Sequence, residues 1–303
     1  MTLPTRRSFL KHTLAAAPAA GLFGLERAEA MEPVKRDYGS RMKLSIAGYS
    51  FRKEFQSDPP VMTLLEEFPK FAAEHGLDAI EPTTYYMPDP PSDEYLNRLK
   101  RNAFLLGLDI SGTAIGNVFT HPPGEERDEQ IATTKAWIDR AALLDAPCIR
   151  IFAGSVQKGT EEEQARKWAI ECIEECCEYS GKKGIFLALE NHGGIVRSAG
   201  QMLAIVKEVR SEWFGVNLDT GNVYSDDPYG ELEAMAPYAV NVQVKVEINP
   251  GGRGKVPADL ERVVGILKDA GYRGYVVLEY EAKEDARTAI PGYLRKLREL
   301  IAC

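Results

Sequence analysis

Ile185-Phe186-Leu187-Ala188-Leu189-Glu190 is a short apolar run that ends in a carboxylate, and Asn191 and His192 follow it directly. A polar residue at the end of such a run is typical of the carboxyl end of a buried parallel strand. Three later stretches have the same form: Leu-Asp219-Thr-Gly-Asn222, Val-Gln243-Val-Lys245 and Leu-Glu279-Tyr. These stretches predict strands whose ends present oxygen-bearing side chains to one site.

Short apolar runs alternate with longer amphipathic runs from Lys43 onward. The expected strands are 43–50, 78–83, 109–115, 147–153, 184–190, 214–219, 239–246 and 274–279. The expected helices are 62–75, 92–106, 125–144, 160–182, 199–210, 229–236, 257–270 and 284–300. Eight such pairs without a linker predict one α/β domain, a (β/α)8 TIM barrel over residues 43–303. Residues 31–42 are expected to form a tail before it.

Alternation along the expected strands predicts a polar lumen. In the seventh strand, valines occupy every second position of 240–246, whereas Asn241, Gln243 and Lys245 occupy the positions between them. Successive side chains of a strand point to opposite faces, so the valines should pack on the helices. Arg150 and Glu190 fall on the polar face of their strands in the same way. Because buried polar groups need partners, this lumen should form a cavity that binds a ligand.

Four oxygen ligands are expected to converge on one divalent cation. Glu190, Asp219, Gln243 and Glu279 end, or nearly end, strands five to eight. Active sites of this barrel lie at the carboxyl ends of the strands, and carboxylate and amide oxygens favour Mg²⁺ or Mn²⁺. In the alternative interpretation, each acid caps the following helix or pairs with a surface lysine.

Further side chains are candidates for the same cavity. Lys245 could polarise a substrate oxygen or only reach solvent at the rim, and His192 could face the site or be an ordinary loop histidine. The side chains expected to contact a substrate are Tyr49, Glu81, Asn117, Arg150 and Asn222. For Tyr49, packing in the barrel wall is the alternative to stacking on a sugar.

Residues 1–30 have the composition of an export signal. Arg6 and Arg7 form a twin-arginine pair, an alanine-rich stretch follows, and Ala28-Glu29-Ala30 offers a cleavage site. The chain is therefore expected to be exported to the periplasm by the twin-arginine route. An amphipathic N-terminal helix on the protein surface is the alternative.

Composition limits the partners. The formal net charge of −8 disfavours nucleic acid, whose phosphates an acidic chain repels. No internal run approaches the roughly 18 apolar residues of a membrane span, so no membrane association is expected after signal cleavage. The five cysteines lack metal-site spacing and are expected to be free thiols. The sequence leaves open whether the chain forms a homo-oligomer.

The motifs around Glu190, Asp219, Gln243 and Glu279 resemble the xylose isomerase-like barrel superfamily, in its sugar phosphate isomerase/epimerase branch, over about residues 43–300. In that family the matching positions are Glu, Asp, His and Glu and hold one divalent metal ion. Here Gln243 replaces the histidine, and Asn222 stands where ketose epimerases usually have a histidine.

The resemblance implies a metal-dependent isomerase or epimerase that removes a proton beside the carbonyl of a keto-sugar. Glu190 and Glu279 would form the acid/base pair, with Lys245 or His192 assisting. A 3-keto-glycoside lyase or dehydratase would use the same residues. A non-catalytic sugar-binding barrel is a further alternative. A hydrolase like endonuclease IV would need a histidine-rich site, and the chain has four histidines.

Overall fold

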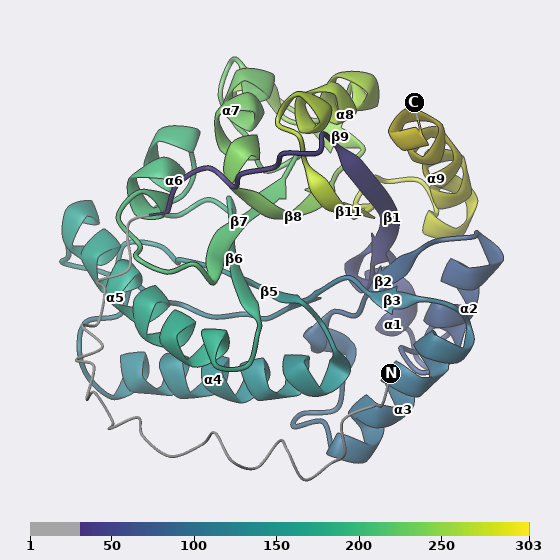
Figure 1. Cartoon of the computed structure of the whole chain (residues 1–303), viewed down its shortest axis with the longest axis horizontal. Coiled ribbons are helices and arrows are strands. Elements are labelled where there is room, and N and C mark those ends of the chain that lie inside the picture. The colour runs from purple at the N-terminus through teal and green to yellow at the C-terminus, as the bar shows by residue number, and fades with distance from the viewer. Residues whose placement is uncertain (1–30, 303) are drawn as a thin grey trace, which may run out of the picture.

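A parallel barrel forms the centre of the molecule (Figure 1); the computed structural model describes residues 31–302. Within these residues, the main sheet has nine strands in the order β3-β2-β1-β11-β8-β7-β6-β5-β4, and all of its paired strands are parallel. The strands are β1 (Arg41–Ala47), β2 (Ala79–Glu81), β3 (Asp109–Ile110), β4 (Thr113–Ala114), β5 (Cys148–Ile151), β6 (Phe186–Glu190), β7 (Phe214–Asp219), β8 (Ala239–Val244) and β11 (Arg273–Leu278).

The barrel closes through an interrupted strand. The predicted strand 109–115 is divided into β3, which pairs with β2, and β4, which pairs with β5. Between them, the Ser111 hydroxyl lies 2.8 Å from the Ser45 hydroxyl, and a Cβ on Gly112 would lie 2.9 Å from Cys148 Sγ. The close contact at Gly112 and the side-chain hydrogen bond at Ser111 accompany the break. Counted as one, β3 and β4 are the third strand of an eight-stranded barrel, so the predicted TIM barrel is confirmed.

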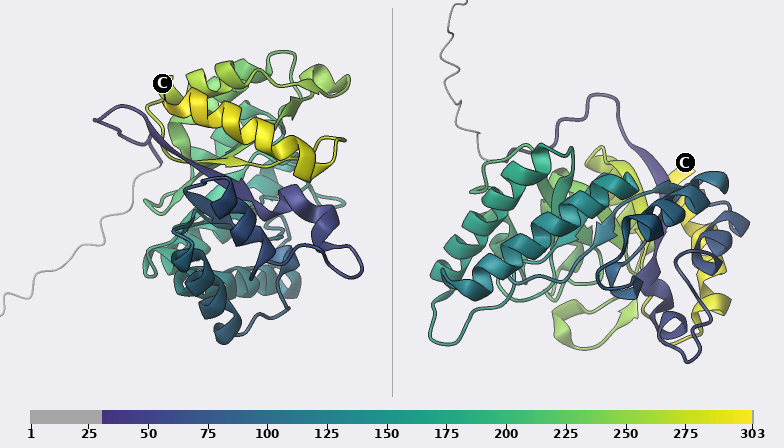
Figure 2. Two further views of the ribbon diagram at one scale, coloured as in Figure 1. Left: turned by 90° about the vertical axis from the view of Figure 1, so that its right-hand side faces the viewer. Right: turned by 90° about the horizontal axis from the view of Figure 1, so that it is seen from below.

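In the described part of the chain, seven helices connect successive strands, an eighth follows the last strand, and together they surround the barrel (Figures 1 and 2). They are α2 (Glu67–Glu74), α3 (Asp93–Leu105), α4 (Glu125–Leu144), α5 (Glu162–Gly181), α6 (Ala199–Val206), α7 (Pro228–Met235), α8 (Leu260–Asp269) and α9 (Ala286–Ala302). Several begin at side-chain caps: Ser198 and Gln201 form a capping box at α6, and Asp227 and Asp259 cap α7 and α8. The predicted helices are therefore present, most with shorter ends.

Short elements occupy the connections, and all of them come after strands except the one that joins α7 to β8. They are η1 (Gly48–Phe51), α1 (Arg52–Phe55), η2 (Thr84–Tyr86), η3 (Ala236–Tyr238), η4 (Pro250–Gly252) and the antiparallel pair β9 (Glu247–Ile248) and β10 (Val256–Pro257). In the right-hand view of Figure 2, the hairpin of β9 and β10 projects from the face opposite residues 31–40. The hairpin stands beside the carboxyl ends of β7 and β8.

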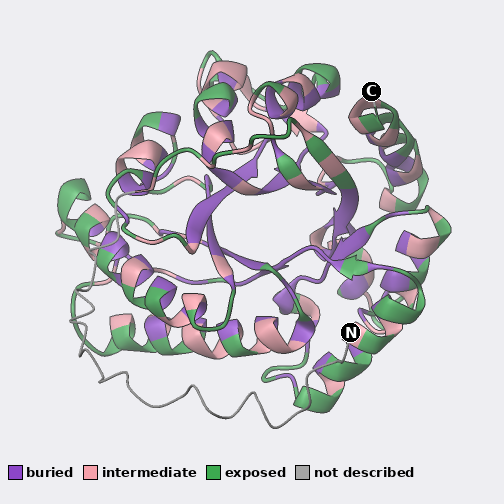
Figure 3. Ribbon diagram, viewed as in Figure 1, coloured by how far each residue is buried: buried purple, intermediate pink, exposed green. Residues whose placement is uncertain are grey.

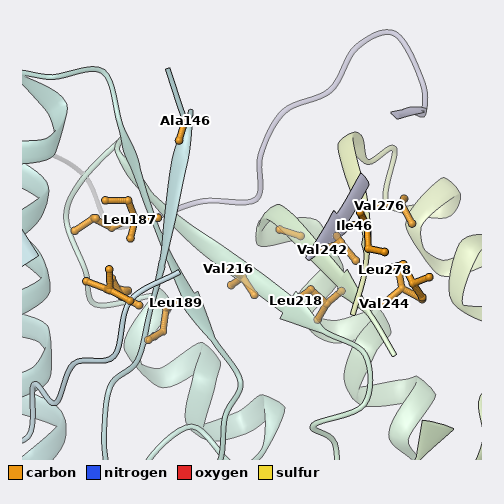
Figure 4. Packing of buried hydrophobic residues seen from close by; sticks show 14 of the residues in the cluster. Ile46, Ala146, Leu187, Leu189, Val216, Leu218, Val242, Val244, Val276 and Leu278 are labelled. Atoms are coloured by element: carbon orange, nitrogen blue, oxygen red, sulfur yellow. The ribbon is translucent and has the colours of Figure 1, made fainter. Parts of the chain in front are cut away.

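The apolar core lies between the sheet and the helices. Val216, Leu218, Val242 and Val244 alternate along neighbouring strands and are fully buried (Figure 4), and the barrel strands are buried along most of their length (Figure 3). Burying such a side chain contributes about 1.5–3 kcal/mol. The expected outward placement of the apolar face is confirmed.

The N-terminal segment 31–40 runs along the outside without regular secondary structure. Met31 N donates to Val209 O and Val34 N donates to Pro237 O. The expected export signal, residues 1–30, lies outside the described residues. None of the helices in residues 31–302 is long and apolar enough to cross a membrane.

Candidate active site

Four charged side chains meet at the carboxyl end of the barrel. Glu190 and Asp219 are the last residues of β6 and β7, whereas Lys245 and Glu279 follow β8 and β11. These four strands are consecutive in the sheet order, and all four side chains are buried. Parallel strands in adjacent register therefore place three acids and one base around a common point.

The Lys245 ammonium lies among carboxylates. Its Nζ is 2.8 Å from Glu279 Oε2 and 3.3 Å from Asp219 Oδ2, and it also contacts Glu281 Oε1. Burial lowers the pKa of Lys245, but the charges of Asp219 and Glu279 outweigh burial and hold the pKa well above its ordinary value. A Cβ on Gly221 would lie 2.5 Å from Lys245 Cγ, so this glycine is what allows the lysine stem to cross the site.

A second cation orients Glu190. Arg150 Nε on β5 lies 2.8 Å from Glu190 Oε2, and Asn222 Nδ2 donates to Glu190 Oε1 at 2.9 Å. Arg150 also donates to the Ile115 carbonyl and to the Tyr85 hydroxyl, at 2.6 and 3.2 Å. Both carboxylate oxygens of Glu190 are thus held by side chains that are themselves anchored.

Deeper in the lumen, four side chains form a closed ring of hydrogen bonds. Gln243 Nε2 donates to Glu81 Oε1 at 2.6 Å, and Asn217 Nδ2 donates to Gln243 Oε1 at 2.8 Å. Asn241 Nδ2 completes the ring, at 2.9 Å from Asn217 Oδ1 and 2.8 Å from Glu81 Oε2. All four residues are essentially inaccessible to solvent. The ring supplies Glu81 with the donors that a buried carboxylate requires.

Backbone contacts fix Asp219. Its N–H donates to Asn191 Oδ1 at 2.9 Å, and Asn191 Nδ2 donates to its carbonyl at 2.8 Å. The carboxylate oxygen Oδ1 accepts from the N–H groups of Gly221 and Asn222. The other oxygen, Oδ2, accepts no hydrogen bond from residues 31–302, although it is buried and faces Lys245. Asp219 Oδ2 is therefore held only by the Lys245 ion pair and keeps its lone pairs for a cation.

Carboxylates outnumber cations in this cluster, and their pKa values reflect it. Burial, reinforced by Glu279, raises the pKa of Glu190 to about 7 against the opposing charge of Arg150. Burial likewise raises the pKa of Asp219 to about 7, with Lys245 opposing and Glu190 adding to the shift. The pKa of Glu81 rises to about 6 because of burial and the nearby Glu279. The site holds more negative charge than its own lysine and arginine neutralise.

The remaining predicted site residues are His192, Tyr49 and Asn117. The His192 ring packs on Phe152 with centroids 4.4 Å apart, and partial burial followed by the Arg150 charge lowers its pKa. The Arg52 guanidinium lies over the Tyr49 ring at 5.5 Å. Asn117 uses both amide atoms on the backbone of Phe152, so in this structure it links two strand ends and has no free amide group.

Sequence reasoning missed four residues: Tyr85, Phe152, Asn191 and Glu281. Tyr85 and Phe152 both contact Arg150, whose guanidinium carbon lies 3.9 Å from the Phe152 ring centroid. A signal for Glu281 was present, because it follows Glu279 at the two-residue spacing of one strand face. Nothing local in the sequence points to Tyr85, which comes from the loop after β2.

A small cavity opens beside Lys245. Its volume is about 120 Å³, and its lining includes Asn222, Tyr224, Lys245, Lys255 and Glu281. Residues of the β9–β10 hairpin form its outer wall. Lys245 and Glu281 therefore border a polar cavity that is also lined by residues of the β9–β10 hairpin.

The donor chemistry of the site fits a divalent cation. Glu190, Asp219 and Glu279 supply excess negative charge, Asp219 Oδ2 accepts no hydrogen bond from residues 31–302 and has only the Lys245 ion pair, and Gln243 Oε1 keeps a second lone pair. As the side chains stand, however, no three His, Cys, Asp or Glu residues between 31 and 302 are arranged to hold a metal ion. The Lys245 ammonium lies between Asp219 and Glu279 in this arrangement.

Several solved structures share the fold. D-Psicose 3-epimerase from Clostridium cellulolyticum H10, solved with D-tagatose, superposes with a TM-score of 0.72 at 19% identity, covering 86% of this chain and 100% of its own. The apo form of 3-keto-D-glucoside 4-epimerase from E. coli gives 0.69 at 16% identity, with 86% and 100% coverage. An IolI protein with a bound zinc atom gives 0.68 at 17% identity, with 86% and 96% coverage. At these identities the likeness shows the fold alone.

Among curated protein sequences, no significant match was found. The profile described as "Xylose isomerase-like TIM barrel" matches residues 69–300, well over half of the chain. That range runs from α2 to α9 and contains every strand that contributes a charged residue to the site. The chain belongs to the xylose isomerase-like TIM barrel family.

Proposed function

We propose that this protein is a divalent-metal-dependent sugar isomerase or epimerase that removes a proton from the carbon beside the carbonyl of a keto-sugar. The observation that carries the proposal is Glu190, a buried carboxylate at a strand end with its pKa raised to about 7. A general base acts best when its pKa is near the working pH. A buried carboxylate with this property is a candidate for proton transfer.

The side chains around Glu190 have separate roles in this proposal. Arg150 and Asn222 hold its carboxylate in one orientation, so that the proton is taken from a fixed direction. Glu279, on the other side of the site, returns the proton to another face for epimerisation or to another carbon for isomerisation. Lys245 donates to substrate oxygens, and His192 and Tyr49 contact the sugar at the rim.

Glu190, Asp219, Gln243 and Glu279 would hold one Mn²⁺ or Mg²⁺ ion. Bound there, the ion would supply Lewis-acid stabilisation of negative charge that develops on a carbonyl oxygen, worth several kcal/mol. Support comes from the excess of buried carboxylates and from Asp219 Oδ2, which accepts no hydrogen bond from the described residues.

Elimination from a 3-keto-glycoside is the second candidate. It is favoured by Lys245, which stays protonated beside Glu279 and could protonate a departing oxygen. The same base would remove the proton, and only the fate of the carbanion would differ.

The substrates to test are keto-sugars and 3-keto-glycosides, since proteins of the same fold act on D-psicose and 3-keto-D-glucoside. The purified protein with Mn²⁺ is incubated with each compound in heavy water. We expect deuterium at the carbon beside the carbonyl, in product or recovered substrate, or an isotope effect on a deuterated substrate when proton return is shielded. A converted substrate with neither sign would show that the chemistry is not deprotonation, and release of the aglycone would identify elimination.

A further inference from the structure

Two of the proposed metal ligands share one ammonium group. Lys245 Nζ lies 2.8 Å from Glu279 Oε2 and 3.3 Å from Asp219 Oδ2, so it lies beside two oxygens that would hold a cation. Two positive charges cannot both be held closely by the same two oxygens. Building on the proposed function, we propose that Lys245 is an internal counter-ion that exchanges with the divalent cation: its ammonium neutralises Asp219 and Glu279 in the metal-free protein and moves to Glu281 when the ion binds.

Glu281 offers a destination for the ammonium. Its Oε1 already contacts Lys245 Nζ, and its side chain is 29% exposed, compared with 0% for Asp219 and 9% for Glu279. The cavity of about 120 Å³ is lined by both Lys245 and Glu281. The lysine stem has several rotatable bonds and a compact charge. A shift toward Glu281 therefore retains one ion pair and moves the ammonium toward the cavity.

The backbone around Lys245 is fixed, so the exchange involves the side chain alone. Lys245 N donates to the Thr220 hydroxyl at 2.9 Å, and Glu279 N donates to the Val244 carbonyl at 3.0 Å. Gly221 leaves space for the lysine stem that a Cβ would fill. The strand ends that carry Asp219 and Glu279 are paired to β8 on either side.

The charge of Lys245 stabilises the metal-free protein. Buried carboxylates without a cation strongly destabilise a fold. In the metal-free protein, Lys245 neutralises these carboxylates and so reduces the destabilisation. The same ammonium then competes with the divalent cation for Asp219 and Glu279. The metal-free protein is therefore expected to be more stable, and its metal affinity lower, than without the lysine.

Lys245→Met tests this by keeping the stem and removing the charge. Mn²⁺ is titrated calorimetrically into chelator-treated wild type, Lys245→Met and the matched control Lys167→Met. Lys167 is an exposed lysine of α5 whose Nζ lies 2.7 Å from Glu163 Oε1, outside the site. We expect Lys245→Met to bind Mn²⁺ about tenfold more tightly or better, and the control to change by about twofold at most. Melting of metal-free Lys245→Met should occur at a lower temperature than wild type, with a larger gain on adding Mn²⁺.

Glu281→Gln provides a second readout that does not depend on Lys245→Met being well folded without metal. With its destination removed, the ammonium should stay between Asp219 and Glu279, so Mn²⁺ binding should weaken. In the Lys245→Met background the same change should have a much smaller effect. Equal affinity in wild type and Lys245→Met, or an equal effect of Glu281→Gln in both backgrounds, would overturn the exchange and leave the metal site intact. If neither wild type nor either lysine variant binds Mn²⁺, the metal dependence in the proposed function is wrong. The exchange is then wrong as well.

Discussion

Gln243 Nε2 donates a 2.6 Å hydrogen bond to Glu81 Oε1 across the barrel lumen, from β8 to β2. Two strands, β1 and β11, lie between them in the sheet. Asn217 also donates to Gln243, so the side-chain amide of Gln243 is hydrogen-bonded to Glu81 through its nitrogen and to Asn217 through its oxygen. The floor of the candidate site is therefore a continuous polar layer, and changes in it should affect the whole barrel.

Replacing Gln243 with leucine should destabilise the protein. Glu81 loses one donor and the Asn217 amide loses its acceptor, both in a buried place, which costs about 1–3 kcal/mol for each group left unpaired. Urea unfolding of chelator-treated protein measures the change. Gln164→Leu on the exposed surface of α5 is the control and should change stability by about 0.5 kcal/mol or less. Equal unfolding midpoints would show that the ring contributes no net stability.

Replacing Glu190 or Glu279 with glutamine should lower turnover of an active substrate about a hundredfold or more, because the shape is kept but the base is lost. Turnover is compared with that of Glu284→Gln, an exposed acid outside the site, which should retain the wild-type rate. Full activity and full metal content in both site variants would refute the assignment of the acid/base pair.

Asp219→Ala should abolish metal retention. The Asn191 side chain still holds the backbone at this position through its N–H and carbonyl, so the end of β7 should stay in place. Elemental analysis after growth with added manganese gives the metal content of each protein. Asp226→Ala, on the exposed loop beyond the site, is the comparison, and equal metal in all three proteins would place the ion elsewhere.

Metal-free protein should lose stability as the pH rises from about 4 to above 7. The pKa values of Glu190 and Asp219 are raised to about 7 in the fold, above the ordinary carboxyl range. The native state therefore binds more protons than the unfolded state across this window, so its stability falls with rising pH, by an amount of order 1.4 kcal/mol per unit of pKa shift.

Unfolding midpoints at pH 5 and pH 8 test this, with Glu190→Gln for comparison. The glutamine variant should show a smaller decline, and Mn²⁺ should reduce the decline in wild type because a cation favours the ionised carboxylates. A decline of the same size in wild type and variant would mean that Glu190 does not titrate in this range.

The predicted export can be tested by fractionating cells that produce the protein. We expect the mature chain to begin near Met31 and to reside in the periplasm, because Arg6 and Arg7 and the Ala28-Glu29-Ala30 stretch match a twin-arginine signal. Fractionation with N-terminal sequencing gives the location and the cleavage point, and Arg6→Lys with Arg7→Lys should trap the precursor. Only full-length protein in the cytoplasm of wild-type cells would contradict the proposal.

The family, the barrel and the identity of the strand-end residues could be predicted because their signals are local. Two-residue alternation in 239–246 separates the valines that face the helices from Asn241, Gln243 and Lys245 in the lumen, and apolar runs that stop at Glu190 and Asp219 mark the strand ends. Such patterns depend on neighbours a few positions away, and the structure confirms the elements they predict.

Only the tertiary structure determined which side chains in the lumen form hydrogen bonds and ion pairs with one another. Gln243 and Glu81 are 162 positions apart, and Lys245 and Glu281 are 36 positions apart. Alternation says that these side chains face inward, but closure of the barrel sets which atoms come within hydrogen-bond distance. In a medium of low dielectric constant, differences of an ångström decide which of several polar groups pair. The sequence alone therefore determined which chemical groups line the site, while the closed barrel determined that an ammonium stands between Asp219 and Glu279.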